Sequence, residues 1–373
     1  MISRIRFGSL EILPDEEVER QIQNLDAKED LPPGGLGNRK RDKSLIVFAR
    51  FCGDEVYPDC SWRQLRSARH EWQEHQVLCQ TAIEIQSVVG CPFDCTYCPY
   101  STFLCVRLDV ETFVQRVAAL ARSRRTQALF KLNNRSDTLG LEPEYGLAPA
   151  LVKLFAGLDE KYLLLYSKGV GVDSLLDLDH RGKTVASFTL TPPSVARLLE
   201  QSAPSPGLRI GAMGKLSRAG YPVRVRLSPI VPLRGWQKQY LRLLRSIQKV
   251  AQPELLTLWT LSMIELSELP AIVPLESLDP QARRWAEEEA ENLGGVKGAP
   301  FPQAYRSRLY REIASMAQDI LPDSRVSLCL ETPQLWRSLG ALVTPRKRGR
   351  FVCNCGPRVT PQVIASWPSS RKR

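Results

Sequence analysis

The sequence predicts an α/β fold organised around a mostly parallel sheet. From about residue 81 to residue 266, six short apolar runs alternate with helical patterns and loops. This alternation is expected when each strand is followed by a helix that returns the chain to the start of the next parallel strand. Hydrophobic residues make up 43% of the 373 residues and charged residues 24%, which allows the chain to bury a large core.

The six strands are short runs rich in apolar, β-branched and aromatic residues. They are expected at residues 82–90, 128–132, 162–167, 185–190, 223–227 and 255–261. Helices are expected where apolar residues recur with helical spacing. They fall at 110–121, 147–157, near 175–176, 191–201, 210–219 and 237–250. Asp109 is placed as the N-cap of the first helix, and Gly220 closes the fifth.

Composition divides the chain into four regions. They are an irregular N-terminal extension at 1–80, the core at 81–266, a helical region at 267–328 and a basic, cysteine-containing tail at 329–373. Within the extension we expect a polar helix and a strand separated by residues that break regular structure. These three segments are the helix at 15–26, the Pro and Gly run at 31–38 and the strand at 44–49.

The net charge of +11 comes largely from clustered Lys and Arg residues. A basic surface can bind a nucleic acid or an acidic peptide, but such clusters also occur on ordinary solvated faces and tails. No apolar run is long enough to span a membrane, and the N-terminus lacks the apolar segment of a signal peptide. We therefore expect a cytoplasmic protein, in a compartment that keeps the cysteines reduced.

Cys91, Cys95 and Cys98 are spaced C-x3-C-x2-C directly after the first predicted strand. Three thiolates in one short loop can bind three irons of a cubane cluster and leave the fourth iron open to a non-protein ligand. A structural zinc site would need a fourth ligand close by, for which Cys105 is the nearest candidate, and a disulfide would leave one thiol unpaired. The spacing favours a [4Fe–4S] cluster.

A second group of cysteines lies in the C-terminal tail. Cys353 and Cys355 form a C-x-C pair followed by Gly, and Cys329 lies upstream. This arrangement is compatible with an auxiliary iron–sulfur cluster, whose fourth ligand would be Cys60, Cys105, a substrate atom or none. The alternatives are three ordinary thiols, or a zinc site completed by a distant residue.

The spacing of the first three cysteines resembles the radical S-adenosylmethionine (SAM) superfamily, in which SAM chelates the open iron. Further segments are similar to its spore photoproduct lyase branch. They are residues 136–137, 166–168, 172–176, 179–184, 188–189, 228–232 and 235–236. The resemblance implies a partial (β/α)6 TIM-like barrel, rather than a closed eight-stranded one, with N- and C-terminal extensions.

The resemblance also implies the cofactors and the reaction. A reduced [4Fe–4S] cluster passes an electron to SAM, whose carbon–sulfur bond breaks to give methionine and a 5′-deoxyadenosyl radical. That radical takes a hydrogen atom from the substrate. The electron would come from a donor such as flavodoxin or ferredoxin, while the protein positions and shields the reacting groups.

Several polar residues follow predicted strands at the edge where parallel sheets bind ligands. Ser136, Asp137 and Thr189 can hydrogen-bond SAM there. Lys168 can neutralise the SAM carboxylate, and Arg226 either does the same or points toward the substrate. For each of these residues the alternative is a polar side chain satisfied by backbone or water.

Residues near the cysteine loop are candidates for the radical step. Tyr97, the aromatic residue before the third cysteine, is expected to contact the cofactor. Tyr97, Tyr100 and Cys105 are candidates for completing the reaction because they lie close to the loop. His180 is expected to belong to the turn before Gly182.

The chain departs from the lyase at two positions. The lyase has a hydrogen-donating cysteine where this chain has Asn134, and a tyrosine where it has Pro99, with Tyr100 one place later. An amide cannot donate a hydrogen atom as a thiol can, so repair of spore photoproduct is not the expected reaction. A barrel with an open side suits a large substrate, and a peptide or another large molecule is expected. The alternatives are a nucleic-acid repair or modification enzyme and a non-enzymatic iron–sulfur redox or binding protein.

Overall fold

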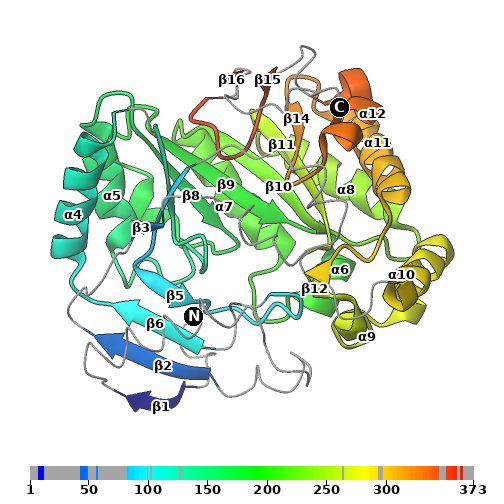
Figure 1. The fold of residues 1–373 in the computed structure, drawn as a ribbon. Coiled ribbons are helices and arrows are strands. Elements are labelled where there is room, and N and C mark those ends of the chain that lie inside the picture. Colours follow the sequence, from blue (N-terminus) through cyan, green and yellow to red (C-terminus); the bar gives the residue numbers. More distant parts are fainter. Residues whose placement is uncertain are drawn as a thin grey trace, which may run out of the picture.

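The computed structural model describes residues 7–11, 43–48, 56–57, 82–98, 100, 103–125, 128–262, 264–292, 297–343, 350–358 and 362–363. An eight-stranded sheet forms its centre, and all of its neighbouring strands pair in parallel except the short edge strand β3 with β4 (Figure 1). In spatial order the strands are β14 (Arg325–Leu328), β11 (Leu255–Thr260), β10 (Val223–Ile230), β9 (Thr184–Leu190), β8 (Tyr162–Ser167), β7 (Leu129–Leu132), β4 (Ile83–Ile85) and β3 (Val56–Tyr57).

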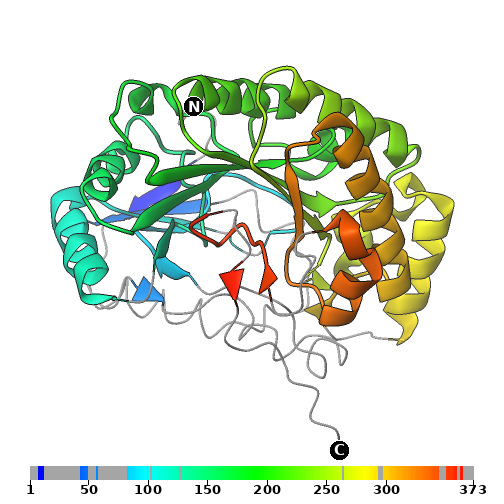
Figure 2. The same cartoon turned by 90° about the horizontal axis from the view of Figure 1, so that it is seen from above.

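The sheet is curved but open, because among the described strands β14 and β3 are its two edges. Figure 2 shows the helices along the convex side and the C-terminal segment on the concave side. This is the partial barrel expected from the sequence, with two strands more than expected, the antiparallel edge strand β3 and the parallel strand β14. Strand β14 extends the parallel sheet beyond β11, with Leu258 paired to Leu328.

The helices up to residue 248 lie close to their predicted positions, those at 269–320 fall in the region predicted to be helical, and the one at 333–339 lies in the tail, where no helix was predicted. They are α4 (Val110–Ser123), α5 (Leu147–Ala156), α6 (Pro193–Leu199), α7 (Pro206–Arg218), α8 (Trp236–Gln248), α9 (Leu269–Ile272), α10 (Pro280–Asn292), α11 (Gln303–Ile320) and α12 (Pro333–Leu339). Short 3-10 helices complete the set at η4 (Asp173–Leu175), η5 (Leu266–Glu268), η6 (Leu275–Ser277) and η7 (Gly340–Leu342). Asp109 caps α4 as predicted, since its side chain accepts a hydrogen bond from the Thr112 amide. The predicted start of α7 was four residues late, because Ser205 caps the helix and Pro206 occupies its first turn.

A single strand was expected at 82–90, but the chain splits it between two sheets. Strand β4 belongs to the main sheet, whereas β5 (Val88–Gly90) joins a four-stranded sheet. Its other strands are β1 (Phe7–Glu11), β2 (Lys43–Phe48) and β6 (Phe103–Arg107). The Asn133 side-chain oxygen accepts from the Ser87 amide at 2.8 Å and the Val88 amide at 3.2 Å, which fixes the bend between the sheets.

The strand expected at 44–49 is therefore β2. The helix expected at 15–26 and the Pro and Gly run at 31–38 lie outside the described residues, as does Cys60. Two short pairs of strands complete the fold. They are β12 (Ile264–Glu265) with β13 (Lys297–Gly298), and β15 (Arg350–Phe351) with β16 (Gln362–Val363).

The two faces of the main sheet differ in chemistry because successive strand residues point to opposite sides. Outward residues such as Phe188, Val225 and Leu256 join the main apolar core with the helices. The alternate, inward residues include the buried Lys131 and Arg226, among other polar side chains. The concave face therefore carries charge that the helix-covered face does not.

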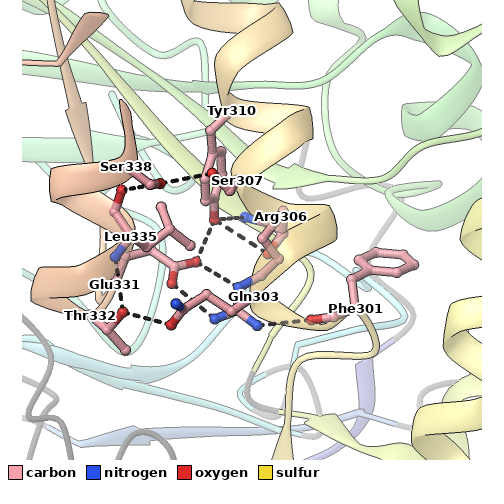
Figure 3. A network of polar contacts seen from close by, with 10 residues as sticks. Phe301, Gln303, Arg306, Ser307, Tyr310, Glu331, Thr332, Leu335 and Ser338 are labelled. Atoms are coloured by element: carbon pink, nitrogen blue, oxygen red, sulfur yellow. Dashed lines mark hydrogen bonds and ion pairs between the residues drawn. The ribbon is translucent and has the colours of Figure 1, made fainter. Parts of the chain in front are cut away.

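Helix α11 is joined to the chain leaving β14 by a buried polar network (Figure 3). Arg306 donates to both carboxylate oxygens of Glu331, at 3.0 and 3.1 Å, and the Tyr310 hydroxyl donates to Glu331 at 2.7 Å. The hydroxyl also accepts from the Thr260 amide at 3.0 Å, at the end of β11. The network fixes the chain two residues after Cys329.

Within the described part of the chain, every helix is too short or too polar to cross a lipid bilayer.

Candidate active site

The loop carrying Cys91, Cys95 and Cys98 leaves β5 and returns to β6, so its two ends are held by antiparallel pairing. The Cys98 amide donates to the Cys95 carbonyl at 3.0 Å, which closes a turn inside the loop. The Thr96 amide donates to the Leu199 carbonyl at 2.9 Å, at the end of α6. This contact docks the loop at the edge of the main sheet where β9 leads into α6.

The three loop thiols influence one another electrostatically. Burial raises the pKa of the Cys91 thiol, and the nearby Asp137, Cys98 and Cys95 raise it further. Burial also raises the pKa of Cys95, to about 11, with Glu200 and Cys98 adding to the shift and Lys168 opposing it. Three thiols within electrostatic reach, with a lysine beside them, fit an anionic thiolate cluster.

No three Cys, His, Asp or Glu side chains among the described residues form a group that could hold a single metal ion. A cubane cluster has a different requirement, since it places each thiolate on a separate iron. The donor set of this loop therefore fits a cluster rather than one ion.

Glu200 is the residue that joins the loop to the sheet, and the sequence analysis missed it. Its carboxylate accepts a 2.6 Å hydrogen bond from the Tyr97 hydroxyl and a 2.9 Å hydrogen bond from Thr191. Arg209, fully buried, lies 2.7 Å from the oxygen that accepts from Thr191. Lys168 lies 3.9 Å from Glu200 and 5.5 Å from the centre of the Tyr97 ring.

The charges in this group stabilise one another. Burial alone would raise the pKa of Glu200, but Lys168 and Arg209 hold it below its ordinary value. Burial alone would lower the pKa of Lys168, but Cys95 and Glu200 raise it above the ordinary value. The pKa of Tyr97 is raised by burial and by the negative charge of Cys95 and Glu200. Lys168 is thus held protonated next to the cysteine loop.

Asp137 holds two loops together at the carboxyl edge of the sheet. One carboxylate oxygen accepts from the Ser167 hydroxyl at 2.6 Å, the Leu139 amide at 3.1 Å and the Gly169 amide at 3.2 Å. The other oxygen accepts from the Lys168 amide at 2.6 Å. Asp137 therefore connects the loop after β7 to the loop after β8, directly at the residue that carries the lysine.

Ser136 and Thr189, both predicted to bind SAM, differ in their hydrogen bonding. The Ser136 hydroxyl is buried and has no hydrogen-bond partner among the described residues. A buried hydroxyl without a partner is unfavourable unless a ligand or water satisfies it. Thr189 is buried in β9, and its carbonyl accepts from Arg209 at 3.2 Å. Ser136 thus offers an open hydrogen-bonding group beside the Asp137 bridge.

Arg226, also predicted to contact SAM or the substrate, has aromatic rings and a cysteine as its neighbours. Its guanidinium stacks 4.4 Å from the centre of the Tyr166 ring and 5.7 Å from that of Trp259. It also donates a long contact of 3.7 Å to the Cys329 sulfur. Arg226 is therefore tied to the C-terminal cysteines.

Four other residues singled out in the sequence have ordinary surroundings. His180 belongs to the turn as expected: its Nδ1 accepts from the Gly182 amide at 3.0 Å. Cys105 is buried in β6, paired with Val89 and Ile46 of neighbouring strands. Tyr100 is half-buried just after the cysteine loop, whereas its neighbour at position 99 lies outside the described residues. The Asn134 amide donates to Glu84 at 2.8 Å.

The C-terminal cysteines come together although Cys329 lies far from the pair in the sequence. Burial raises the pKa of Cys329 to about 11, with Arg226 opposing the shift and Cys355 adding to it. A hydrogen bond to Cys355 is the largest of the effects that raise the pKa of Cys353, and the reciprocal bond lowers the pKa of Cys355 to about 6. The three thiols therefore form a group of their own.

Comparison with known proteins agrees with this geometry. The family model for spore photoproduct lyase matches residues 77–267, just over half of the chain. Spore photoproduct lyase of Bacillus subtilis (strain 168) is 26% identical over 170 residues, 44% of this chain and 50% of that protein. The homologue of Geobacillus sp. (strain Y412MC61) is 24% identical over 172 residues, again 50% of its length. The chain spans about half the length of the curated relatives it matches.

Solved structures show the same fold. Spore photoproduct lyase complexed with dinucleoside spore photoproduct superposes with a TM-score of 0.62 at 17% identity, covering 87% of this chain and 98% of that one. A mutant of the lyase with bound AdoMet and dinucleoside spore photoproduct gives a TM-score of 0.60 at the same identity, covering 86% and 98%. The chain belongs to the spore photoproduct lyase family, within the radical SAM superfamily.

Proposed function

We propose that this protein is a radical SAM enzyme that acts on a nucleic acid. The observation that carries the proposal is the position of the cysteine loop. Its three thiols lie at the carboxyl edge of a partial barrel, docked on α6 and next to the Glu200 and Lys168 pair. The carboxyl edge is where parallel sheets of this kind bind their ligands.

The residues at this edge fit a [4Fe–4S] cluster and SAM. Cys91, Cys95 and Cys98 would hold the cluster, and the open Ser136 hydroxyl and the Lys168 ammonium would meet polar and carboxylate groups of SAM. When both are bound, one-electron reduction of SAM supplies the radical that abstracts hydrogen from the substrate. The electron would come from a donor such as flavodoxin or ferredoxin, in the reducing cytoplasm that free cysteines favour.

The chain's own groups orient this site. Glu200 holds the Tyr97 hydroxyl at 2.6 Å and keeps Lys168 protonated beside Cys95. Asp137 fixes the backbone of Lys168 through a 2.6 Å hydrogen bond to its amide. The buried side chains also exclude water from the edge, which strengthens the charge interactions there. Glu200 and Asp137 would thus position the residues that surround the cofactors, while Tyr97 stays a candidate for the radical step.

A nucleic acid is supported as substrate by the relatives and by charge. A solved relative holds a dinucleoside spore photoproduct, and this chain carries a net charge of +11. The peptide substrate expected from the sequence finds no support among these relatives. Asn134, at the position of the lyase's hydrogen-donating cysteine, is bonded to Glu84, so hydrogen return to the product would need another group.

Binding of nucleic acid is tested by titrating the reconstituted protein with single- and double-stranded oligonucleotides at several salt concentrations. Affinity should fall linearly in a plot of log K against log salt, because binding releases the counterions of the neutralised phosphates. Ultraviolet-irradiated DNA should also raise the rate of 5′-deoxyadenosine formation above that with undamaged DNA. An affinity that stays constant from low to high salt would contradict a nucleic-acid substrate.

A further inference from the structure

The C-terminal cysteines are held in place by contacts from several strands. The segment at 350–358 lies on the concave side of the sheet (Figure 2). Arg224, fully buried in β10, donates to the carbonyls of Asn354 and Gly356, both at 2.7 Å. The Ser187 hydroxyl of β9 donates to the Asn354 side chain at 2.9 Å. These contacts fix the backbone on both sides of Cys355.

The third cysteine reaches the same place from another part of the chain. Cys329 directly follows β14, and its amide donates to the Leu258 carbonyl at 3.0 Å. Two residues later, Glu331 is locked by Arg306 and Tyr310 of helix α11 (Figure 3). Cys329 therefore has a fixed backbone. Arg226, which contacts the Cys329 sulfur at 3.7 Å, lies two residues after Arg224 on the same face of β10, so this strand places Cys329 beside the segment that carries Cys353 and Cys355.

Two buried cations accompany these thiols. Arg226 contacts the Cys329 sulfur at 3.7 Å, and Lys131 is close enough to Cys355 to influence it. Lys131 also pairs with Glu84 at 2.8 Å, so the lysine is held in place on the concave face. Buried cations compensate negative charge that three thiolates and a cofactor would bring into a low-dielectric interior.

Unused hydrogen-bond donors point to a ligand at this position. Arg226 is only 8% exposed, and its buried Nε group has no hydrogen-bond partner among the described residues. The indole N–H of Trp259, whose ring stacks on Arg226, is likewise buried without an acceptor. Such donors are costly to bury, and the sulfur atoms of iron–sulfur clusters accept hydrogen bonds of this kind.

We propose that Cys329, Cys353 and Cys355 bind a second iron–sulfur cluster, of the [4Fe–4S] type, in which these thiolates would hold three of the four irons. A single zinc ion fits less well, since structural zinc takes four protein ligands. Among the described residues no group of Cys, His, Asp or Glu could hold a single ion at this place. Two carboxylates lie near these thiols, and both already have partners. Glu84 is bonded to Lys131 and Asn134, and Glu331 to Arg306 and Tyr310.

This cluster would be separate from the one proposed for SAM, and its ligand set makes the two separable by experiment. Cys105 lies in β6 of the other sheet, so it is a cysteine of neither set and provides a matched control. Three proteins are compared with wild type after anaerobic reconstitution. They are the triple variants Cys329→Ala/Cys353→Ala/Cys355→Ala and Cys91→Ala/Cys95→Ala/Cys98→Ala, and the single variant Cys105→Ala.

Iron, zinc and acid-labile sulfide are counted per chain, and the reduced proteins are examined by electron paramagnetic resonance. Wild type and Cys105→Ala should hold about eight irons, and each triple variant about four, as two cubanes require. The Cys91/Cys95/Cys98 variant should still show the signal of a reduced cluster. The iron count and this signal do not depend on SAM cleavage. The second cluster can therefore be tested even if the proposed function is wrong.

Two results would overturn the second cluster. One is a wild type with about four irons that all disappear in the Cys91/Cys95/Cys98 variant. The other concerns the Cys329→Ala/Cys353→Ala/Cys355→Ala protein, called the tail variant. If it loses about one zinc and no iron relative to wild type, the site is a zinc site. If the tail variant does not fold, the Cys91/Cys95/Cys98 variant decides alone: about four irons support the cluster and none refute it.

Discussion

The Tyr97 hydroxyl donates a 2.6 Å hydrogen bond to the carboxylate of Glu200, which joins the cysteine loop to the end of α6. The same carboxylate lies 2.7 Å from Arg209, and both side chains are fully buried. One glutamate thus neutralises a buried arginine, holds a lysine beside the thiols and orients the aromatic residue of the loop. Its removal should affect stability and the site together.

The substitution Glu200→Gln keeps the shape but removes the charge. Arg209 would then be buried without a counter-charge, which should lower the free energy of unfolding by about 3–5 kcal/mol. Urea denaturation measures this change. The matched control is Glu287→Gln, which breaks an exposed pair with Arg283 on α10 and should leave the denaturation midpoint unchanged. Equal midpoints for both variants would contradict the role assigned to Glu200.

The four hydrogen bonds to Asp137 make the loops after β7 and β8 interdependent. Asp137→Asn would place an amide donor near the Lys168 amide, now 2.6 Å from the carboxylate. Two buried donors facing each other should cost about 1–3 kcal/mol. The Lys168 and Gly169 amides should also exchange with solvent faster, and KM for SAM should rise more than kcat falls. Asp179→Asn, at an exposed pair with Arg181, is the control that should change none of these. Unchanged exchange at Lys168 and Gly169 would count against the bridge.

Two glycines give opposite predictions for the same substitution. A Cβ on Gly171 would lie 2.1 Å from the Glu142 carbonyl oxygen, so Gly171→Ala must move the backbone after β8 and should destabilise the protein by about 1–3 kcal/mol. A Cβ on Gly211, within α7, would meet no atom within 4 Å. Gly211→Ala should therefore stabilise the protein by about 0.5–1 kcal/mol, since alanine favours helices. Thermal unfolding of the two variants measures both effects, and a reversed order would contradict the close approach of the Gly171 backbone to Glu142.

Arg224 fixes the C-terminal segment to the sheet. Replacing it with methionine removes its 2.6 Å ion pair with Glu254. It also removes two charge-assisted hydrogen bonds to the Asn354 and Gly356 carbonyls, each worth about 1.5–3 kcal/mol. Amides at 353–356 should then exchange faster with solvent, while those of α5 stay protected. Arg358→Ala, at an exposed contact with Glu160, should change the segment much less. Equal exchange in both variants would show that Arg224 does not hold the segment.

Local sequence signals predicted much of the framework. The six parallel strands of the core, the Asp109 cap and the cysteine loop each depend on residues close together in the chain. The bend that divides residues 82–90 between two sheets depends instead on Asn133, some 45 positions away. The apolar sequence of residues 82–90 does not indicate a hydrogen bond to a distant side chain, so a single strand was predicted there.

The organisation of the site was harder to predict for the same reason. Glu200 looks like an ordinary polar residue at a helix end, and only the fold places it next to Tyr97, Lys168 and Arg209. Strand β14 is four residues long and follows a helical region, so its place beside β11 was not visible in the sequence. Its position is what brings Cys329 onto the concave face.

The central claim is that Cys91, Cys95 and Cys98 form the site where SAM is cleaved. The most direct measurement is the yield of 5′-deoxyadenosine from SAM, under anaerobic reduction, for wild type, Cys98→Ala and Cys105→Ala. All three should show the same circular dichroism, because Cys98 lies in a loop and its loss leaves the sheet intact. Wild type and Cys105→Ala should form 5′-deoxyadenosine, and Cys98→Ala should form none. Formation of 5′-deoxyadenosine by Cys98→Ala at the wild-type rate would contradict the assignment.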